Sequence, residues 1–465
     1  MVGKLTESVA ESVQLIRRFA AHRLFRSAAV EELELDGDFY RRPLRSEDLE
    51  FIDFSTPVTA DTACHLSSLA SQRILRCILD MNIARPPPTA DAAEFARHAD
   101  FYSDGNRALA ARIAPFLETH AFGFLGQAID ERRSDAPELR SQFGAICDAA
   151  DQFCSDVLRG SFAVDALRFI FVQKWCLAED KRAALAKARG AGHFDLITPE
   201  GCPGLEPNRA EDDIVTQLAA ALRVDGRPHT YWQFYLPTSL AEANHVGVLA
   251  ARSDRALQLI GAAFVAEVEW MQFVRVTAEA GGDLGLLASD DWWRGQLRRR
   301  ADLEARFARA VNAVADRFGP AGLSEMSRGL QASSRLAQVV RRDLESQLRW
   351  LACFDQYVDL ARSIDERIRT RQPDIDRETF VEPREMCSTT HVHDDHRLVV
   401  IESGHMTFWG NMGMQMRMAP GDMILVPQGR LHGSSVESEQ CIYHQPIIPD
   451  DWVRSLIDEM AIRAG

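Results

Sequence analysis

The chain has 465 residues, and its 53 lysines and arginines against 68 aspartates and glutamates give a formal net charge of -15 at pH 7. Nucleic acids and anionic membranes bind cationic protein surfaces, so this balance argues against either as the main partner. With 46% hydrophobic and 26% charged residues, the composition is that of an ordinary soluble globular protein. The chain is long for one core, and its length predicts about two to four domains.

The sequence predicts a cytoplasmic protein with reduced thiols. No apolar run approaches the roughly 18–20 residues that cross a bilayer, and Met1–Arg26 carries Glu7, Glu11 and Arg17 among its apolar residues. That pattern is typical of an amphipathic helix and not of a signal peptide. The nine cysteines are dispersed without a C-x-x-C pair, which favours free thiols over a disulfide framework.

Residues 1 to about 370 are predicted to be helical, because apolar residues recur at spacings of three and four among good helix formers. The clearest segments are Arg107–Glu118, Ile214–Leu222, Arg255–Thr277, Leu303–Arg317 and Gly329–Phe354. Glycines and prolines predict breaks at residues 85–89, 199–207, 281–282 and 319–320.

The pattern changes near Gln372. From about Thr379 onward, short apolar runs alternate with turn residues, which indicates short strands in a β-sandwich or barrel. The runs are Leu398–Glu402, His405–Trp409, Met414–Met418 and Met423–Val426. The predicted fold class is multidomain α + β, with mostly helical N-terminal and central domains followed by a small C-terminal β-barrel.

The histidines are unevenly distributed. Six of the 13 lie in the last 75 residues, and none lies between His245 and His391. His391 and His393 are two residues apart, so in an extended chain both imidazoles point to one side. In the stretch Gly421–His432, the turn Pro427-Gln428-Gly429 can bring His432 back towards them. Three neutral imidazoles around one point suit Fe(II), Zn(II), Cu(II) or Ni(II) and leave coordination positions open.

These two motifs resemble the signature motifs of the cupin family. Cupins usually carry a glutamate at the position of Arg397, so the resemblance implies a site of three histidines, His391, His393 and His432. Arg397 has two open interpretations. In the first, its side chain points inward and either binds a substrate carboxylate or pairs with Asp394 or Glu402. In the second, its side chain turns outward to solvent. The remaining C-terminal histidines, His396, His405 and His444, are assigned to places outside the metal site.

A wider resemblance covers most of the chain. Residues 101–124, Tyr231–Leu236 and 382–443 resemble the N-nitrosourea-forming metalloenzymes of the streptozotocin type. The resemblance implies a helical dimerisation domain at 1–145, a heme-oxygenase-like domain at 146–370 and a cupin domain at 371–465. In that family the central diiron domain N-hydroxylates a methylated arginine. The cupin then rearranges the product oxidatively to an N-nitrosourea, with iron on three histidines.

The central domain departs from that family. Glu179 and Glu267 occupy two of its carboxylate positions, but Ala210, Gly295, Arg299 and Asp302 stand at other ligand positions. Arginines at 298–300 and 306 also repel ferrous ions. We therefore expect no intact diiron site, with Glu179 and Glu267 as relics or as partners of internal arginines. His193, with Asp195 and Glu200 nearby, is either a ligand of one metal ion or a loop histidine.

The sequence thus predicts an iron-dependent cupin enzyme that forms an N–N bond on an N-hydroxylated amino acid or guanidine. The expected cofactor is one Fe(II) per chain, with Zn(II) as the alternative, and the expected catalytic residues are Arg397 and Tyr443. Gln428, Trp409 and Met416 are weaker candidates for the pocket wall. The expected partners are a small-molecule substrate, dioxygen, a second copy bound through the N-terminal helices and a separate N-hydroxylase.

The sequence leaves two alternatives to that function open. One is a three-histidine cupin dioxygenase, or a zinc-dependent cupin enzyme, that acts on another small molecule. The other is a catalytically inactive partner or sensor of a diiron homologue.

Overall fold

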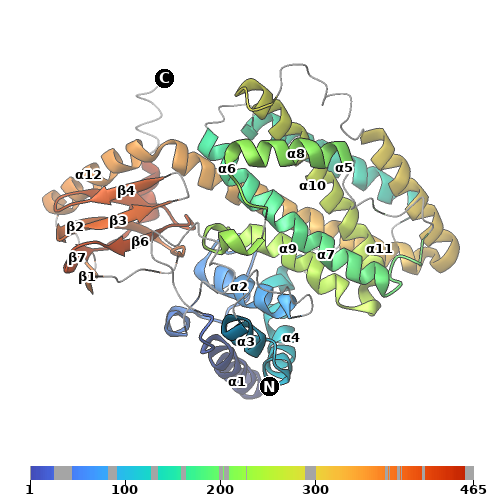
Figure 1. The fold of residues 1–465 in the computed structure, drawn as a ribbon, viewed down its shortest axis with the longest axis horizontal. Coiled ribbons are helices and arrows are strands. Elements are labelled where there is room, and N and C mark those ends of the chain that lie inside the picture. The colour runs from blue at the N-terminus through green and yellow to red at the C-terminus, as the bar shows by residue number, and fades with distance from the viewer. Residues whose placement is uncertain are drawn as a thin grey trace.

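The computed structural model describes residues 2–25, 44, 46–81, 92–126, 135–158, 164–197, 203, 209–226, 228–287, 300–371, 375, 377–384, 388, 390–410 and 414–455. A large helical part is followed by a smaller antiparallel β domain, as the sequence predicts (Figure 1). The last helix ends at Arg371 and the first strand begins at Thr379. The breaks predicted at 85–89 and, except for Pro203, at 199–207 lie outside the described residues.

The N-terminal helices form the lower part of the molecule in Figure 1. They are α1 (Val2–Ala20), α2 (Leu66–Asp80), α3 (Ala92–Phe101) and α4 (Asp104–Gly126), with a short 3-10 helix, η3 (Glu47–Phe51), before α2. Their apolar faces share one core cluster that includes Phe19, Ile74, Phe101 and Ile113. This packing places the start of α2 beside the β domain.

The first helix of the central bundle is α5 (Ala136–Leu158), which runs across the domain border predicted between residues 145 and 146. Leu139 and Phe143, before that border, and Cys147 and Ala150, after it, are buried in one core cluster. One helix face therefore buries residues on both sides of the predicted border. The rest of the bundle consists of α6 (Val164–Phe171), the π-helical turn η4 (Val172–Cys176), α7 (Leu177–Gly190), α8 (Arg209–Leu222), η6 (Pro228–Phe234), α9 (Pro237–Ala250), η7 (Ser253–Arg255), α10 (Ala256–Asp283) and α11 (Arg300–Ala352).

The stretch Ser253–Asp283, which contains α10, is long and apolar enough to cross a membrane by length and composition alone. In the structure, 83% of its most apolar window is buried inside the protein. Its alanines, valines and phenylalanines pack against α5 and α11. We interpret it as the core helix of the bundle.

The helix α11 connects the bundle to the β domain. It bends at Gly319, whose φ of 62° is a conformation that residues with a Cβ rarely adopt, and Pro320 follows as the sequence predicts. Below, the helices α1 to α11 are called the helical body. The helix α12 (Phe354–Arg371) then packs against the β domain, where Leu360 and Ile364 share a core with Leu398 and Leu425.

The β domain consists of two antiparallel sheets. One has the strand order β1-β7-β2-β5 with β8 paired to β2, and the other has the order β4-β3-β6. The strands are β1 (Thr379–Pro383), β2 (His396–Ser403), β3 (Met406–Trp409), β4 (Gln415–Met418), β5 (Met423–Val426), β6 (Gly433–Val436), β7 (Gln440–His444) and β8 (Ile447–Ile448). Four of these strands fall on the four runs that the sequence analysis identifies.

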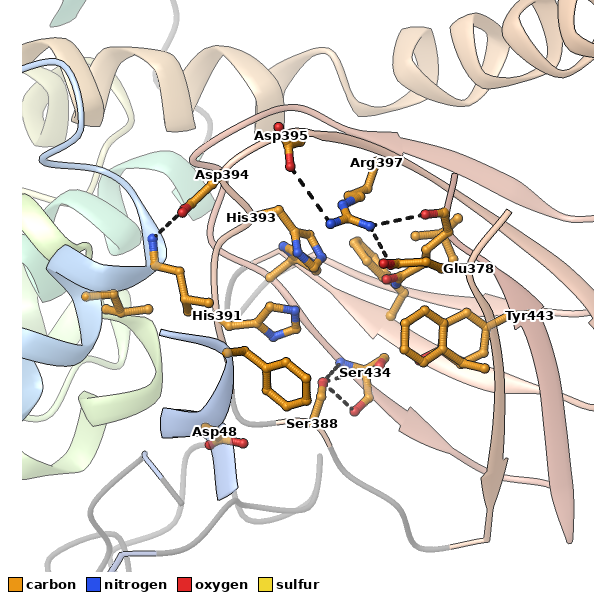
Figure 2. A pocket seen from close by; sticks show the side chains of 18 of the residues that line it. Asp48, Glu378, Ser388, His391, His393, Asp394, Asp395, Arg397, Ser434 and Tyr443 are labelled. Atoms are coloured by element: carbon orange, nitrogen blue, oxygen red, sulfur yellow. Dashed lines mark hydrogen bonds and ion pairs between the residues drawn. The ribbon is translucent and has the colours of Figure 1, made fainter. Parts of the chain in front are cut away.

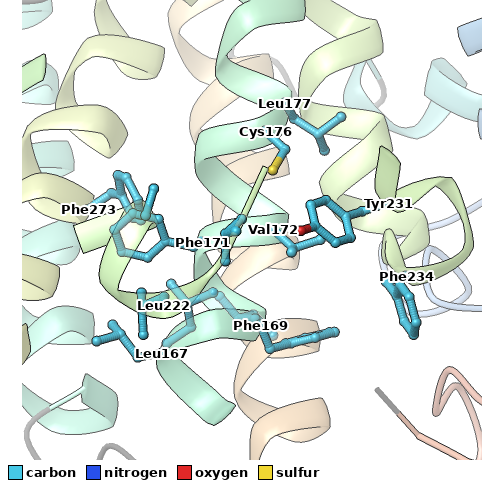
Figure 3. Packing of buried hydrophobic residues seen from close by; sticks show 14 of the residues in the cluster. Leu167, Phe169, Phe171, Val172, Cys176, Leu177, Leu222, Tyr231, Phe234 and Phe273 are labelled. Carbon is cyan, nitrogen blue, oxygen red and sulfur yellow. The ribbon is translucent and has the colours of Figure 1, made fainter. Parts of the chain in front are cut away.

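One apolar cluster, the joint apolar cluster, contains residues of both the β domain and the helical body. It is built mainly from bundle residues such as Phe169, Phe171 and Phe234 (Figure 3). Val392 and Leu431 of the β domain are fully buried in the same cluster. Both are direct neighbours of predicted metal ligands, so the segments that carry those histidines are packed into the helical body.

Candidate metal centre

His391, His393 and His432 come together as the sequence predicts. Each offers a ring nitrogen, and these three atoms lie within 4.8 Å of one another. His391 and His432 face each other across an antiparallel bridge, in which the backbone N–H of each donates to the carbonyl of the other at 2.9 and 3.0 Å. His393 projects to the same side as His391 because Val392, between them, is buried in the opposite direction.

The ring of His432 is held in a defined tautomer. Its Nδ1 lies 2.8 Å from the carbonyl oxygen of Arg430, which can only accept, so Nδ1 carries the proton. Nε2 then has a free lone pair. Nε2 of His432 and Nε2 of His393 are both buried and have no hydrogen-bond partner among the described residues. Buried imidazole nitrogens without partners are costly in a protein interior, and metal ligation satisfies them.

The protonation states of His393 and His432 also fit a metal site. Burial, and after it the neighbouring ring of His391, lowers the pKa of His432 from 6.5 to about 3. Burial, followed by the rings of His391 and His432 and the charge of Arg397, lowers the pKa of His393 well below its usual value. Both rings are therefore neutral near pH 7, which is the form that binds a metal ion.

The three histidines open onto a cavity of about 800 Å³ between the β domain and the N-terminal helices (Figure 2). One wall comes from the β domain and includes Glu378, Arg397 and Tyr443. The opposite wall comes from η3 and α2, more than 300 residues earlier in the chain, and includes Asp48, Phe51, Leu66, Leu69, Ala70 and Arg73. A cavity of this size, with more apolar than polar surface and several charged side chains in its walls, is typical of a small-molecule site.

Arg397 points into this cavity. Its guanidinium donates to Glu378 at 2.6 Å and to the Gln445 carbonyl at 3.3 Å, and it lies 3.9 Å from Asp395. The outward orientation left open by the sequence is thus wrong, and so are the two protein partners considered there, Asp394 and Glu402. Asp394 instead accepts from the Leu66 backbone at 2.7 Å, and Glu402 pairs with His444 at 2.9 Å.

Tyr443 lies on β7 and lines the same cavity. Its ring stacks on Phe380 at 5.2 Å, and its hydroxyl hydrogen-bonds to Glu382. Burial, and then the charge of Glu382, raises the pKa of Tyr443 above its ordinary value of 10. The hydroxyl therefore stays protonated and acts as a hydrogen-bond donor.

The weaker candidates do not line the cavity. Gln428 lies at the contact with the helical body, Trp409 is fully buried in the joint apolar cluster, and Met416 packs on the core of the β domain. The three histidines expected outside the metal site, His396, His405 and His444, are indeed outside it.

The central bundle offers no comparable group. Among the described residues, the three histidines are the only set of three or more His, Cys, Asp or Glu side chains close enough to share a metal ion. Glu179 is exposed, whereas Glu267 is buried and pairs with Arg306. His193 is a buried residue, Asp302 is exposed, and Glu200, Gly295 and Arg299 lie outside the described residues.

Other buried carboxylates of the bundle are also paired with cations. Lys174 and Lys181 contact Glu242 at 2.8 and 2.9 Å, and Arg341 pairs with Glu269. Burying a charge is tolerated when an opposite charge lies beside it. These pairs explain how the bundle holds its inward carboxylates without a metal ion, as the sequence analysis expects for Glu267.

Several site residues escape sequence analysis. On β1 and just before it, Glu378, Phe380 and Glu382 alternate with exposed residues and all line the cavity, so a period-2 pattern could have revealed them. No periodic pattern in the sequence marks the residues of η3 and α2 that line the cavity. They approach the histidines only through the packing of the folded chain.

The comparisons with known proteins agree with this geometry. Residues 378–443 match the model of the cupin domain, so the C-terminal β domain, with its three-histidine cluster, is a cupin domain. The whole chain is a distant homologue of the nitrosourea synthase of Streptomyces achromogenes subsp. streptozoticus. The two are 24% identical over 422 residues, which cover 87% of this chain and 88% of that relative.

Proposed function

We propose that this protein is a metal-dependent oxidoreductase whose reaction takes place at the three histidines of the cupin domain. The reaction is an oxidative rearrangement that forms an N–N bond of the N-nitroso type, with dioxygen as the oxidant. The substrate is an N-hydroxylated amino acid or guanidine. The observation that carries the proposal is the set of three convergent imidazoles at a cavity, in a chain similar to nitrosourea synthase over most of its length.

The residues present fit a metal ion. Nε2 of His393 and Nε2 of His432 face inward without a partner among the described residues, and His391 completes the group. With Arg397 where many cupins carry a glutamate, the donor set is three neutral nitrogens, which Fe(II) and Zn(II) both accept. Iron held by these three residues would supply the redox chemistry of the reaction.

The cavity walls provide the groups that bind and orient an amino acid. Arg397 carries a planar guanidinium that matches a carboxylate, and Glu378 beside it matches an ammonium or guanidinium group. Tyr443 donates a hydrogen bond without losing its proton. Phe408, stacked on the His432 ring at 5.4 Å, keeps water from that side of the ring.

In this proposal the central bundle acts as a scaffold and does not hydroxylate the substrate. Its buried carboxylates Glu242, Glu267 and Glu269 pair with lysines and arginines. The N-hydroxylated substrate then comes from a separate enzyme. A homodimer formed through the N-terminal helices belongs to the same proposal.

The test uses the metal-free full-length protein reconstituted with Fe(II) and supplied with an N-hydroxylated guanidino amino acid and dioxygen. We expect oxygen uptake in proportion to substrate and a product with a new N–nitroso group, detected by mass spectrometry. The same assay with His432→Ala serves as the blank. Purified protein with stoichiometric zinc and no oxygen uptake would contradict the oxidative proposal, and cleavage of a C–C bond would indicate a dioxygenase instead.

A further inference from the structure

Each of the three metal-site histidines adjoins a residue that is bonded to the helical body. For His391 that residue is Thr390, which is buried. Its hydroxyl and its backbone N–H both donate to the side-chain oxygen of Gln233, at 2.8 and 3.3 Å. Gln233 lies in η6 and is itself 1% exposed. The segment before His391 is thus fixed to the bundle by a polar contact without access to water.

For His393 the bonded neighbour is Asp394. Its carboxylate accepts the backbone N–H of Leu66, the first residue of α2, at 2.7 Å, and an acid at a helix N-terminus is stabilising. Gln428 strengthens the contact, since its side-chain nitrogen lies 2.8 Å from the Asp394 carbonyl oxygen and 3.0 Å from a ring nitrogen of His65.

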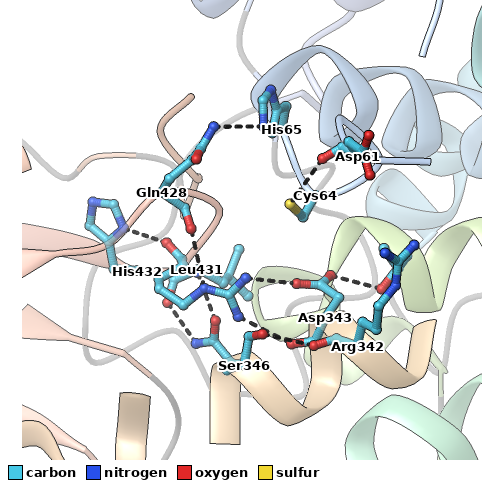
Figure 4. A network of polar contacts seen from close by, with 12 residues as sticks. Asp61, Cys64, His65, Arg342, Asp343, Ser346, Gln428, Leu431 and His432 are labelled. Atoms are coloured by element: carbon cyan, nitrogen blue, oxygen red, sulfur yellow. Dashed lines mark hydrogen bonds and ion pairs between the residues drawn. The ribbon is translucent and has the colours of Figure 1, made fainter. Parts of the chain in front are cut away.

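For His432 the contacts are the most extensive (Figure 4). Leu431 donates its N–H to the Gln347 side chain at 3.0 Å, and its carbonyl accepts from the same side chain at 3.1 Å. Arg430 donates to the carbonyl and to the carboxylate of Asp343, both at 3.1 Å. Asp343 is in turn bonded to Thr238 at 2.8 Å. Gln347 and Asp343 both lie on α11.

The contact of Arg430 reaches the metal site directly. The carbonyl of Arg430 accepts a hydrogen bond from Nδ1–H of His432 and thereby favours the tautomer in which Nε2 carries no proton. A shift of the segment 430–431 therefore moves both the backbone of His432 and the group that orients its ring. Since Val392 and Leu431 are also buried in the joint apolar cluster, all three histidines depend on the helical body for their place.

We propose that the helical body is part of the metal centre, with Gln347 and Asp343 of α11 as positioning residues that hold His432 in its metal-binding geometry. The inference rests on the proposed function, because it assumes that the three histidines bind a metal ion. It extends that function by assigning a role to α11, none of whose residues touch the cavity. Residues behind a metal ligand typically contribute about 10- to 100-fold to metal affinity.

The bundle itself offers a matched control. Gln173 is another buried glutamine, 1% exposed against 0% for Gln347. Its side chain also accepts one backbone N–H, from Leu236 at 2.9 Å, and donates to one carbonyl, of Phe234 at 2.7 Å. Both of those partners belong to the helical body. Gln347 makes the same two kinds of bond to Leu431 and also donates to the Gly410 carbonyl at 3.4 Å. Gln173→Ala and Gln347→Ala thus remove the same kinds of bond, but only Gln347→Ala loosens the segment beside a metal ligand.

The experiment titrates full-length metal-free protein with Co(II) and records its visible absorption, for the wild type, Gln347→Ala, Gln173→Ala and His432→Ala. We expect Gln347→Ala to bind Co(II) about 10- to 100-fold more weakly with a changed spectrum. Gln173→Ala should lose thermal stability to a similar extent yet keep the affinity and spectrum of the wild type. Should Gln347→Ala fail to fold, Asp343→Asn, which keeps the volume of the side chain, is expected to weaken Co(II) binding in the same sense.

Two outcomes overturn the inference in distinguishable ways. If Gln347→Ala and Asp343→Asn bind Co(II) like the wild type, or if Gln173→Ala weakens binding equally, the helical body has no specific role in the metal centre. If His432→Ala binds Co(II) like the wild type, the three histidines are not the metal site, and the proposed function fails with it.

Discussion

The cupin domain and the central bundle both bury side chains of the types that can bind metals, but the partners of these side chains differ. In the cupin domain, Nε2 of His393 and Nε2 of His432 lack hydrogen-bond partners among the described residues. In the bundle, Glu267 and Glu269 each contact an arginine. Lone pairs that converge without partners indicate a binding site, whereas a carboxylate beside a guanidinium indicates a structural ion pair. The partners of these buried groups therefore distinguish a candidate metal site from structural ion pairs better than residue type does.

The largest effect is expected from removing one of the three histidines that the proposal assigns as metal ligands. We expect His393→Ala or His432→Ala to abolish metal binding and oxygen-dependent turnover, since the loss of a ligand exceeds the roughly 100-fold cost of losing a residue behind one. Metal analysis after dialysis and oxygen uptake measure the two effects. His444→Ala is the control, because His444 pairs with Glu402 at 2.9 Å outside the cluster. Equal metal loss in the control would mean that the domain, and not the site, was damaged.

The second test concerns the bundle. Arg306→Met removes the guanidinium beside Glu267, which is 1% exposed. Breaking one side of a buried ion pair costs about 3–5 kcal/mol of unfolding free energy, measured by urea denaturation. Replacing both partners, as in Arg306→Met with Glu267→Met, should recover most of that loss, and metal content should not change.

An exposed pair provides the comparison for this test. Arg362→Met breaks the surface contact with Asp359 and should cost less than about 1 kcal/mol. If Arg306→Met costs no more than Arg362→Met, or if it creates an iron site, the bundle carboxylates are not the structural ion pairs described above.

The third test is the pH dependence of stability in the bundle. Burial, and then the charge of Arg255, lowers the pKa of His245 from 6.5 to about 4 in the folded protein. The unfolded chain therefore binds more protons between pH 6.5 and 4, so stability falls as the pH decreases through this window. The difference corresponds to about 3 kcal/mol. Unfolding free energies of the wild type and His245→Gln should converge as the pH falls from 6.5 to 4, and parallel curves would contradict the assignment.

The fourth and smallest effect concerns the cavity wall. Arg397→Lys keeps the charge but loses the planar fork that donates to Glu378. We expect KM for the N-hydroxylated substrate to rise about 10- to 100-fold, the usual cost of one charge-assisted hydrogen bond, while metal affinity stays the same. Arg417→Lys, at an exposed pair with Glu437, is the control. A loss of metal with unchanged KM would place Arg397 in the metal site instead.

The two regions also differ in how far the sequence predicts them. The three histidines follow from local patterns, because His391 and His393 are two residues apart and a turn precedes His432. The helical character of residues 1 to about 370 and four of the eight described strands follow from periodicity in the same way. The domain border at residue 145 stays a prediction, and α5 buries one face on both sides of it.

The parts that the sequence does not predict are long-range contacts. The partner of Arg397 is Glu378, which lies beside it on the same wall of the cavity, and no local spacing in the chain indicates this pair. Arg73 and Phe51 reach the cavity from more than 300 residues away. The two bonds of Gln347 to Leu431 depend on how α11 packs against the β domain. Such contacts are fixed by packing and leave no periodic signal.

The central claim is that the chain holds one metal centre, at the three histidines, and that the bundle holds none. Its most direct test is the number of Fe(II) ions bound per chain when metal-free full-length protein is titrated without oxygen. We predict one tightly bound iron per chain in the wild type and none in His393→Ala. Two irons per chain, or one that persists in His393→Ala, would contradict the account.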